Sequence, residues 1–375
     1  MLIAIQILCG FVLLIVGAEV LVRGAVRLAA LLGMTPLVIG LTVVAFGTSS
    51  PELAVSLQSV FAGSAELAVG NAVGSNTLNI LLILGLAALI FPMAVQRQVI
   101  RLDLPVMIGV TVALLLICRD GEINRWEGIG MVIFLISYIS FLIRISRRET
   151  RQAREAAKAA LAEIEQEASE TSNENEPASI SLFGLFVKQA SLVIAGLLIL
   201  GFGCRLFVNG SVELARVLGV SELMIGVTVV SIGTSLPELV TTVIASFRNQ
   251  REMAVGNIVG SNLFNILCVL GVTASVSPVA LPVPEQAILF DIPVTLGAAI
   301  ICLPIFFTKM EISRWEGLLM VVLYSAYLGY LVMVAVDSPY LDLLTFSIWY
   351  GLFPFTLVLL TGSMFLSLKK ADPHG

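Results

Sequence analysis

Two glutamates lie in the middle of long apolar segments, each inside the same short motif. Glu52 belongs to Gly-Thr-Ser-Ser-Pro-Glu-Leu (residues 47–53), and Glu238 belongs to Gly-Thr-Ser-Leu-Pro-Glu-Leu (residues 233–239). A carboxylate at the centre of a membrane span costs about 2.5–3.5 kcal/mol on insertion scales, so it indicates a function by default. The duplicated glutamates therefore predict a cation site within a membrane.

Each glutamate has further oxygen atoms nearby in the sequence. The motif proline removes a backbone N–H and breaks its helix, so carbonyls near Ala45–Gly47 and Ser231–Gly233 lose their donors. A second duplicated motif, Gly-Asn-x-x-Gly-Ser-Asn-x-x-Asn, places a serine and an asparagine four residues apart on one helix face. The hydroxyl and amide residues of both motif pairs are Thr48, Ser49, Thr234, Ser235, Ser75, Asn79, Ser261 and Asn265. Calcium takes about 6–8 such oxygen ligands, whereas a soft transition metal prefers Cys or His.

Both motifs belong to one internal repeat. Residues 17–85 recur without a gap as residues 203–271, and 35 of the 69 aligned pairs are identical. A looser match extends the repeat, because Arg-Trp-Glu-Gly occurs at residues 125–128 and again at residues 314–317. The chain is therefore expected to consist of two related halves.

Composition predicts the class of protein. The chain is 58% hydrophobic and 13% charged, which is typical of an integral membrane protein. Its five cysteines have no paired spacing and are interpreted as reduced packing residues. The single histidine, His374, is penultimate, which argues against histidine-dependent catalysis or zinc chemistry. The N-terminus has no basic stretch before its apolar segment, so we interpret it as a first membrane helix.

Eleven apolar windows are long enough to cross a bilayer of about 30 Å. They predict an all-α membrane fold of two inverted five-helix repeats followed by an eleventh C-terminal helix. The windows are 3–22, 36–60, 67–91, 102–119, 127–146, 185–208, 222–247, 253–277, 287–307, 316–336 and 343–367. The expected units are a first repeat (1–146), a cytoplasmic linker (147–184), a second repeat (185–336) and an extra helix with a tail (337–375). Within the linker, residues 154–168 are expected to form a short helix.

Basic residues predict the orientation. Of the 21 lysines and arginines, 17 fall in alternate loops and the C-terminal tail. The positive-inside rule then places the N-terminus outside and the linker and C-terminus in the cytoplasm, as expected of a cell (inner) membrane protein. Five spans per repeat is an odd number, so the second copy enters the membrane inverted. Inverted repeats with interrupted helices are typical of secondary transporters.

On these two duplicated motifs the sequence resembles the cation/calcium exchanger superfamily, in particular its prokaryotic sodium/calcium exchangers. The resemblance covers roughly residues 1–336. It implies ten helices in two inverted halves, alternating access driven by sodium entry, and Glu52 and Glu238 as central ligands completed by the motif hydroxyls. Two features depart from that family. Asn265 stands where many sodium/calcium exchangers have aspartate, and an eleventh span follows the usual ten.

The resemblance leaves the coupling ion open. The two glutamates give a formal charge of −2, which one Ca²⁺ or two protons balance and three Na⁺ exceed. We expect Ca²⁺ to be exchanged for Na⁺, because paired hydroxyls and freed carbonyls suit monovalent ions. A proton/calcium antiporter and a potassium-dependent sodium/calcium antiporter are alternatives. An intramembrane enzyme or a cation channel is disfavoured, because catalysis normally differentiates two carboxylates and a channel does not require inverted symmetry. The lipid bilayer is the expected environment, with no cofactor and no nucleic-acid partner, and the oligomeric state is left open.

Four further interpretations concern other polar residues. Asp103 and Asp291 precede prolines by two residues and are interpreted as helix N-caps. Asn71 and its repeat equivalent Asn257 fit helix packing and site lining about equally. Glu19 aligns with an arginine in the second repeat, so it is expected at an interface. Glu66 and Glu252 begin predicted spans, where an acidic residue suits a helix N-terminus.

Overall fold

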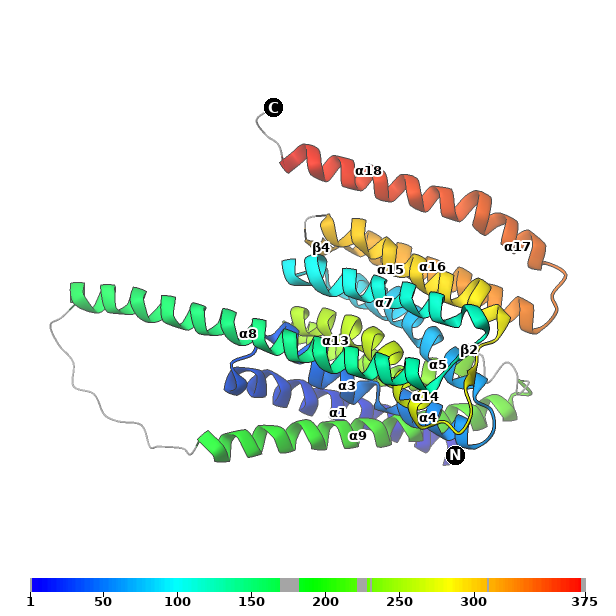
Figure 1. Cartoon of the computed structure of the whole chain (residues 1–375), viewed down its shortest axis with the longest axis horizontal. Coiled ribbons are helices and arrows are strands. Elements are labelled where there is room, and N and C mark those ends of the chain that lie inside the picture. The colour runs from blue at the N-terminus through cyan, green and yellow to red at the C-terminus, as the bar shows by residue number, and fades with distance from the viewer. Residues whose placement is uncertain (1, 169–181, 221–227, 230, 309, 372–375) are drawn as a thin grey trace.

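The computed structural model describes residues 2–168, 182–220, 228–229, 231–308 and 310–371. Most of them form long helices that run roughly alongside one another (Figure 1). Ten of the described helical stretches are long and apolar enough to cross a membrane, which confirms the predicted all-α membrane fold. The predicted span at 222–247 lies partly outside the described residues. Its described end is a shorter apolar helix, α12 (Leu236–Phe247).

The first half of the chain alternates long helices with short π-helical turns. Its elements are α1 (Leu2–Leu32), α2 (Pro36–Ile39), η1 (Gly40–Val44), α3 (Ala45–Thr48), α4 (Ser50–Phe61), α5 (Glu66–Thr77), η2 (Leu78–Ile83), α6 (Leu84–Ile90), β1 (Met93–Ala94), η3 (Val99–Asp103), α7 (Leu104–Ile117), η4 (Cys118–Asp120), β2 (Glu122–Ile123) and α8 (Arg125–Ala168). The predicted linker helix at 154–168 is the continuation of α8, because no residue interrupts the helix after the membrane segment.

The second half repeats this order. Its elements are α9 (Leu182–Val217), α11 (Ser231–Thr234), α12, α13 (Arg251–Phe264), η6 (Asn265–Leu270), α14 (Gly271–Val276), β3 (Leu281–Pro282), η7 (Ala287–Asp291), α15 (Ile292–Phe307), β4 (Glu311–Ile312) and α16 (Arg314–Ala335). The additional C-terminal span consists of α17 (Leu341–Ser347), η8 (Ile348–Leu352) and α18 (Phe353–Ala371). This span lies at the edge of the molecule beside α15 and α16 (Figure 1).

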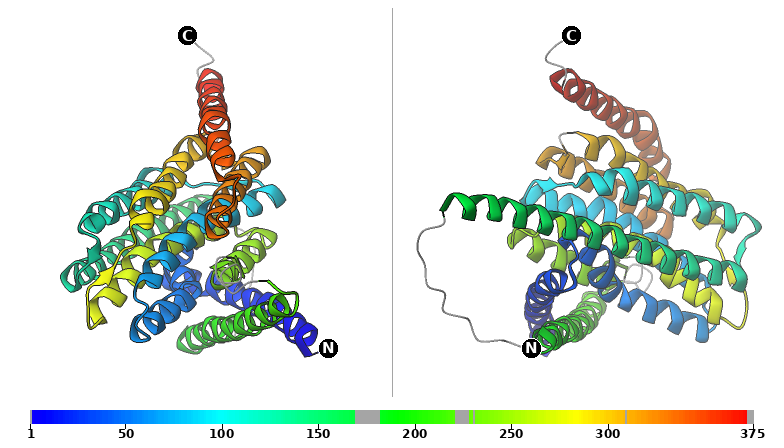
Figure 2. Two further views of the ribbon diagram at one scale, coloured as in Figure 1. Left: turned by 90° about the vertical axis from the view of Figure 1, so that its right-hand side faces the viewer. Right: turned by 60° about the vertical axis from the view of Figure 1, so that its left-hand side comes forward.

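The first helices of the two halves, α1 and α9, pack side by side (Figure 2). Glycines occur every seven residues on both, at positions 10, 17 and 24 of α1 and 196, 203 and 210 of α9. A Cβ atom at Gly17 would lie 2.6 Å from the Leu200 backbone nitrogen, and one at Gly196 would lie 2.6 Å from that of Leu21. The missing side chains thus allow the two backbones to approach closely, as small residues do in membrane helices.

Other contacts exchange equivalent elements between the halves. Strand β1 pairs antiparallel with β4, and β2 pairs with β3. Helix α6 meets α16 where Gly85 faces the Gly317 carbonyl, and α14 meets α8 where Gly128 faces the Gly271 carbonyl. Each of these pairs joins one element of the first half to one of the second half. In the equivalent pair, each element is replaced by its repeat counterpart from the other half. This reciprocity is what a two-fold relation between inverted halves produces.

The expected N-caps at Asp103 and Asp291 are wrong. Neither side chain caps the helix that follows it. Instead, Asp103 accepts a hydrogen bond of 2.6 Å from the Tyr138 hydroxyl, and Asp291 accepts one of 3.0 Å from the Tyr327 hydroxyl. A π-helical turn precedes each aspartate, so its backbone is already helical and leaves no exposed helix start to cap.

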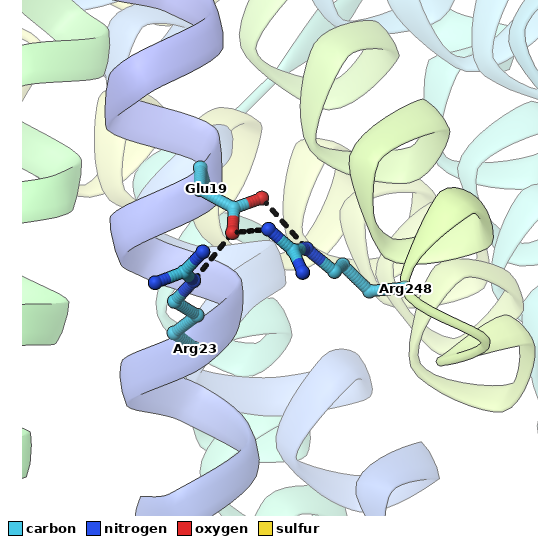
Figure 3. Close-up of polar contacts among 3 residues, drawn as sticks. All are labelled: Glu19, Arg23 and Arg248. Carbon is cyan, nitrogen blue, oxygen red and sulfur yellow. Dashed lines mark hydrogen bonds and ion pairs between the residues drawn. The ribbon is translucent and has the colours of Figure 1, made fainter.

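Glu19 lies at an interface, as expected. Its carboxylate on α1 forms ion pairs with Arg23 on the same helix and with Arg248 at the C-terminal end of α12 (Figure 3). Arg248 lies in the turn that joins α12 to α13. The aligned residues of the other repeat are Arg205 and Ala62, which cannot form this pair. The ion pair therefore exists on one face of the molecule only.

Candidate cation site

Both glutamate motifs interrupt a helix at the same point. Helix α3 ends at Thr48, Ser49 leaves the helical conformation (φ −81°, ψ 4°), and α4 begins at Ser50 with Glu52 in its first turn. In the second half Ser235 (φ −93°, ψ 10°) separates α11 from α12, and Glu238 lies in the first turn of α12. Each motif proline stands at the start of the new helix, where its missing N–H is tolerated. The predicted helix breaks are present in both halves.

The two motifs meet through reciprocal hydrogen bonds. The Ser49 hydroxyl donates to Glu238 Oε1 over 3.1 Å, and the Ser235 hydroxyl donates to Glu52 Oε1 over 3.1 Å. Each serine thus binds the glutamate of the opposite half. Both carboxylates are fully buried. The fold therefore brings the two predicted central carboxylates into one polar layer inside the helix bundle.

Helix α13 completes this layer on one side. The Thr48 hydroxyl lies 3.3 Å from Ser261 Oγ and 3.3 Å from the Ala45 carbonyl oxygen. Ser261 in turn lies 3.4 Å from Glu238 Oε1. Four of the predicted residues, from both halves, therefore form one continuous chain of oxygen atoms.

The two predicted asparagines lie in π-helical turns. Asn79 is the second residue of η2, and Asn265 is the first residue of η6. Such turns are frequent at functional sites because they change the direction of side chains along a helix. Both asparagines are fully buried, and neither amide group has a hydrogen-bond partner among the described residues. The second carboxylate oxygens of Glu52 and Glu238 are likewise unpartnered within that part of the chain.

Unpartnered buried oxygens are rare, because each costs about 1–3 kcal/mol when it is left unsatisfied. Here they occur at two carboxylates and two amides that the sequence had already singled out. Hard cations bind oxygen atoms of these kinds. Among the described residues no three His, Cys, Asp or Glu side chains come close enough to hold a metal. A cation bound here therefore depends on hydroxyl, amide and carbonyl oxygens as well as on the two carboxylates.

The remaining predicted residues are placed consistently with this layer. Ser75 and Thr234 are buried, and the Ala45 side chain is completely covered. Ser231 is the first residue of α11, but its side chain lies outside the described part of the chain. No predicted site residue whose side chain is described lies on the surface of the bundle.

Asn71 and Asn257, for which packing and site lining were equally favoured, support the motifs directly. Asn71 Nδ2 donates to the Glu52 carbonyl over 3.1 Å. Asn257 Oδ1 lies 3.2 Å from the Thr48 hydroxyl. Each asparagine amide also donates to a hydroxyl fifteen residues earlier, Asn71 to Ser56 and Asn257 to Thr242. These two residues therefore position the broken helices.

A second pair of asparagines, Asn76 and Asn262, was not predicted from the sequence. Asn76 Nδ2 donates to the Asn262 backbone carbonyl over 3.1 Å, and both residues are buried. They lie where α5 and α13 meet, so they join equivalent helices of the two halves. Both residues are repeated inside the second motif, which marks them as significant. Repetition alone does not show whether such a residue joins the two halves or binds a cation.

Comparison with known proteins shows the family of the chain. The family model for sodium/calcium exchanger proteins matches residues 2–144 and 188–333. The sodium/calcium exchanger MaX1 of Methanosarcina acetivorans is 35% identical over 351 residues, covering 86% of this chain and 96% of that protein. The inner membrane protein YrbG of Escherichia coli K12 is 39% identical over 273 residues, covering 72% and 79%.

A solved structure gives the same result for the fold. The sodium-calcium exchanger NCX_Mj superimposes with a TM-score of 0.71 at 28% sequence identity, covering 88% of this chain and 99% of that one. The matched region includes both halves and leaves the linker between them unmatched by the family model. The chain therefore belongs to the sodium/calcium exchanger family.

Proposed function

We propose that this protein is an antiporter that expels Ca²⁺ in exchange for Na⁺ through a single central site. The reciprocal pairing of Ser49 with Glu238 and of Ser235 with Glu52 carries the proposal. It brings two acidic groups and their hydroxyls from opposite halves to one buried position. MaX1 and NCX_Mj are named sodium/calcium exchangers, which supports the same choice of ions.

We assign the ligands by the chemistry of the described atoms. Glu52 and Glu238 supply the negative charge that a divalent cation requires. Asn79 and Asn265 supply neutral oxygens from the two π-helical turns. The hydroxyls and freed carbonyls of the two motifs supply weaker ligands suited to Na⁺. No resident cofactor is needed, because the ions are themselves the substrates.

We propose alternating access, in which the site opens to each side of the membrane in turn. Helix α13 is packed tightly against α2 and η1, where a Cβ atom at Gly256 would lie 2.5 Å from the Leu37 carbonyl oxygen. The equivalent glycines of α5 are Gly70 and Gly74, and a Cβ atom at either would meet no described atom within 4 Å. The repeat aligns α2 and η1 with residues 222–230, most of which lie outside the described part of the chain. Tight packing of α13 on one side of the buried carboxylates, in a chain of two inverted repeats, supports access that alternates between the two sides.

The orientation proposed from the basic residues is compatible with the loop contacts. Strand β1 and strand β4 lie in loops predicted to be cytoplasmic, and they pair with each other. Strands β2 and β3 lie in loops predicted to be outside, and they also pair. Helix α13 begins at Arg251, in a loop with Arg248 that is predicted to be cytoplasmic. We propose that the α13 side faces the cytoplasm, with the N-terminus outside and the C-terminus inside. A tag before Leu2 that is inaccessible from outside intact cells would contradict this orientation.

A proton/calcium antiporter is the second candidate, and the asparagine pair favours it. Because Asn79 and Asn265 are both neutral, only Glu52 and Glu238 can take up protons in the central layer. Two protons then replace one Ca²⁺ without moving net charge. Three Na⁺ would instead carry one net positive charge inward for each Ca²⁺ expelled.

The coupling ion is tested with purified protein in proteoliposomes loaded with Ca²⁺. Under the sodium proposal, external Na⁺ drives Ca²⁺ release, and an imposed membrane potential changes the rate. Vesicles with a pH gradient and no sodium serve as the matched control and should show little release. Strong release in these vesicles, unaffected by a clamped potential, would favour proton exchange. Release that needs no opposing gradient would indicate a channel.

A further inference from the structure

The proline of each glutamate motif leaves one backbone carbonyl without its helical donor. In a helix the N–H of residue i donates to the carbonyl of residue i−4. Pro51 and Pro237 have no N–H, so the Gly47 and Gly233 carbonyls lose this bond. By repeat symmetry the two carbonyls are equivalent, and both border the helix break that carries the acidic ligand.

A cysteine supplies the missing donor in the second half. The Cys204 thiol on α9 donates to the Gly233 carbonyl oxygen over 3.2 Å, and both residues are buried. The distance is short for a hydrogen bond donated by a thiol, which is a weak donor. Sequence reasoning interpreted this cysteine as packing, but the contact gives it a specific polar partner.

The first half has no such donor at the equivalent position. Cys204 aligns with Ala18, a completely buried residue of α1 whose methyl group carries no polar hydrogen. The glycine and the proline of the motif are identical in the two repeats, whereas this supporting residue differs. The two halves therefore differ in how the freed carbonyl is satisfied.

We propose that Cys204 determines the sodium affinity of the second half by occupying the Gly233 carbonyl. A carbonyl held by a thiol is a poorer cation ligand than a free one, so this half offers one oxygen fewer to Na⁺. The first half keeps the Gly47 carbonyl free of a thiol at that position. This inference rests on the proposed sodium/calcium exchange and adds an inequality between the two halves of the site.

The test compares Cys204→Ala with Cys204→Ser in proteoliposomes, with Na⁺-driven Ca²⁺ release as the readout. Cys204→Ala frees the carbonyl, so the Na⁺ concentration for half-maximal release should fall about threefold to tenfold, with the maximal rate changed by less than about twofold. Cys204→Ser keeps a donor and should retain the Na⁺ dependence of the unaltered protein. Cys302→Ala is the matched control, because it removes another buried thiol, on α15.

Two results would overturn the inference. The first is an unchanged Na⁺ dependence in Cys204→Ala. The second is an equal shift in Cys204→Ser, which would indicate packing in place of hydrogen bonding. If Cys204→Ala does not fold, Cys204→Val removes the donor while filling more of the space. If the unaltered protein shows no Na⁺-driven release, the proposed function fails, and that outcome is distinct from failure of this inference.

Discussion

Helices α13 and α5 carry the same motif, yet their surroundings differ. Every residue of α13 from Met253 to Phe264 is buried. In α5 the aligned motif begins at Gly70, which is exposed, and Leu67 beside it is 58% exposed. Equivalent sequences in inverted halves thus occupy inequivalent environments. The same motif therefore lies in a fully buried environment on α13 and in a partly exposed one on α5.

The largest effect is expected from the carboxylates of Glu52 and Glu238. They are equivalent positions of the repeat, although the helices around them differ in burial. Glu52→Gln and Glu238→Gln should each lower Ca²⁺ transport about 100-fold or more, because each removes one of two buried charges that balance a divalent ion. Flux in proteoliposomes measures the effect. Glu66→Gln, at the exposed start of α5, is the control and should transport normally. Substantial Ca²⁺ transport by Glu52→Gln or Glu238→Gln would contradict the proposed cation site.

An intermediate effect is expected from the glycines that distinguish the two helices. Gly256→Ala places a methyl group 2.5 Å from the Leu37 carbonyl, so it should destabilise the protein by about 1–3 kcal/mol. Gly70→Ala meets no described atom within 4 Å and should leave stability nearly unchanged. Thermal unfolding of the purified proteins distinguishes the two.

Transport by the same glycine variants sharpens the comparison further. If α5 packs as α13 does when the site opens to the other side, Gly70→Ala should slow exchange although the protein remains stable. Full activity in Gly70→Ala would show that α5 never packs tightly. Equal loss of stability in both variants would show that the difference between the two helices is absent in solution.

The smallest effect is expected from the ion pair beside the start of α13. Arg248→Ala removes the link between Glu19 on α1 and the turn before α13. The side chains are partly exposed, so the loss in stability should be below about 1 kcal/mol and should vanish at high salt. Arg23→Ala removes only the pair within α1 and serves as the comparison. A salt-independent loss in Arg248→Ala would contradict an electrostatic role.

Several features of the fold followed from local properties of the sequence. Apolar length predicted the membrane helices, and Pro51 and Pro237 predicted where two of them break. The repeat predicted that the two halves are related. The N-cap assignment of Asp103 and Asp291 failed, because spacing to a proline does not reveal the π-helical turn before each residue or the tyrosine that binds it.

The sequence by itself determined which chemical groups lie at mid-membrane depth, because burial cost and helix breaking are properties of individual residues and their neighbours. The tertiary structure alone decided which of these groups meet. Ser49 binds Glu238, 189 residues away, and not Glu52 of its own motif. It also decided that α13 is fully buried from Met253 onward while Gly70 of α5 is exposed, and that Cys204 reaches the Gly233 carbonyl. Identical motifs carry identical local preferences, so only the packing of the two halves distinguishes them.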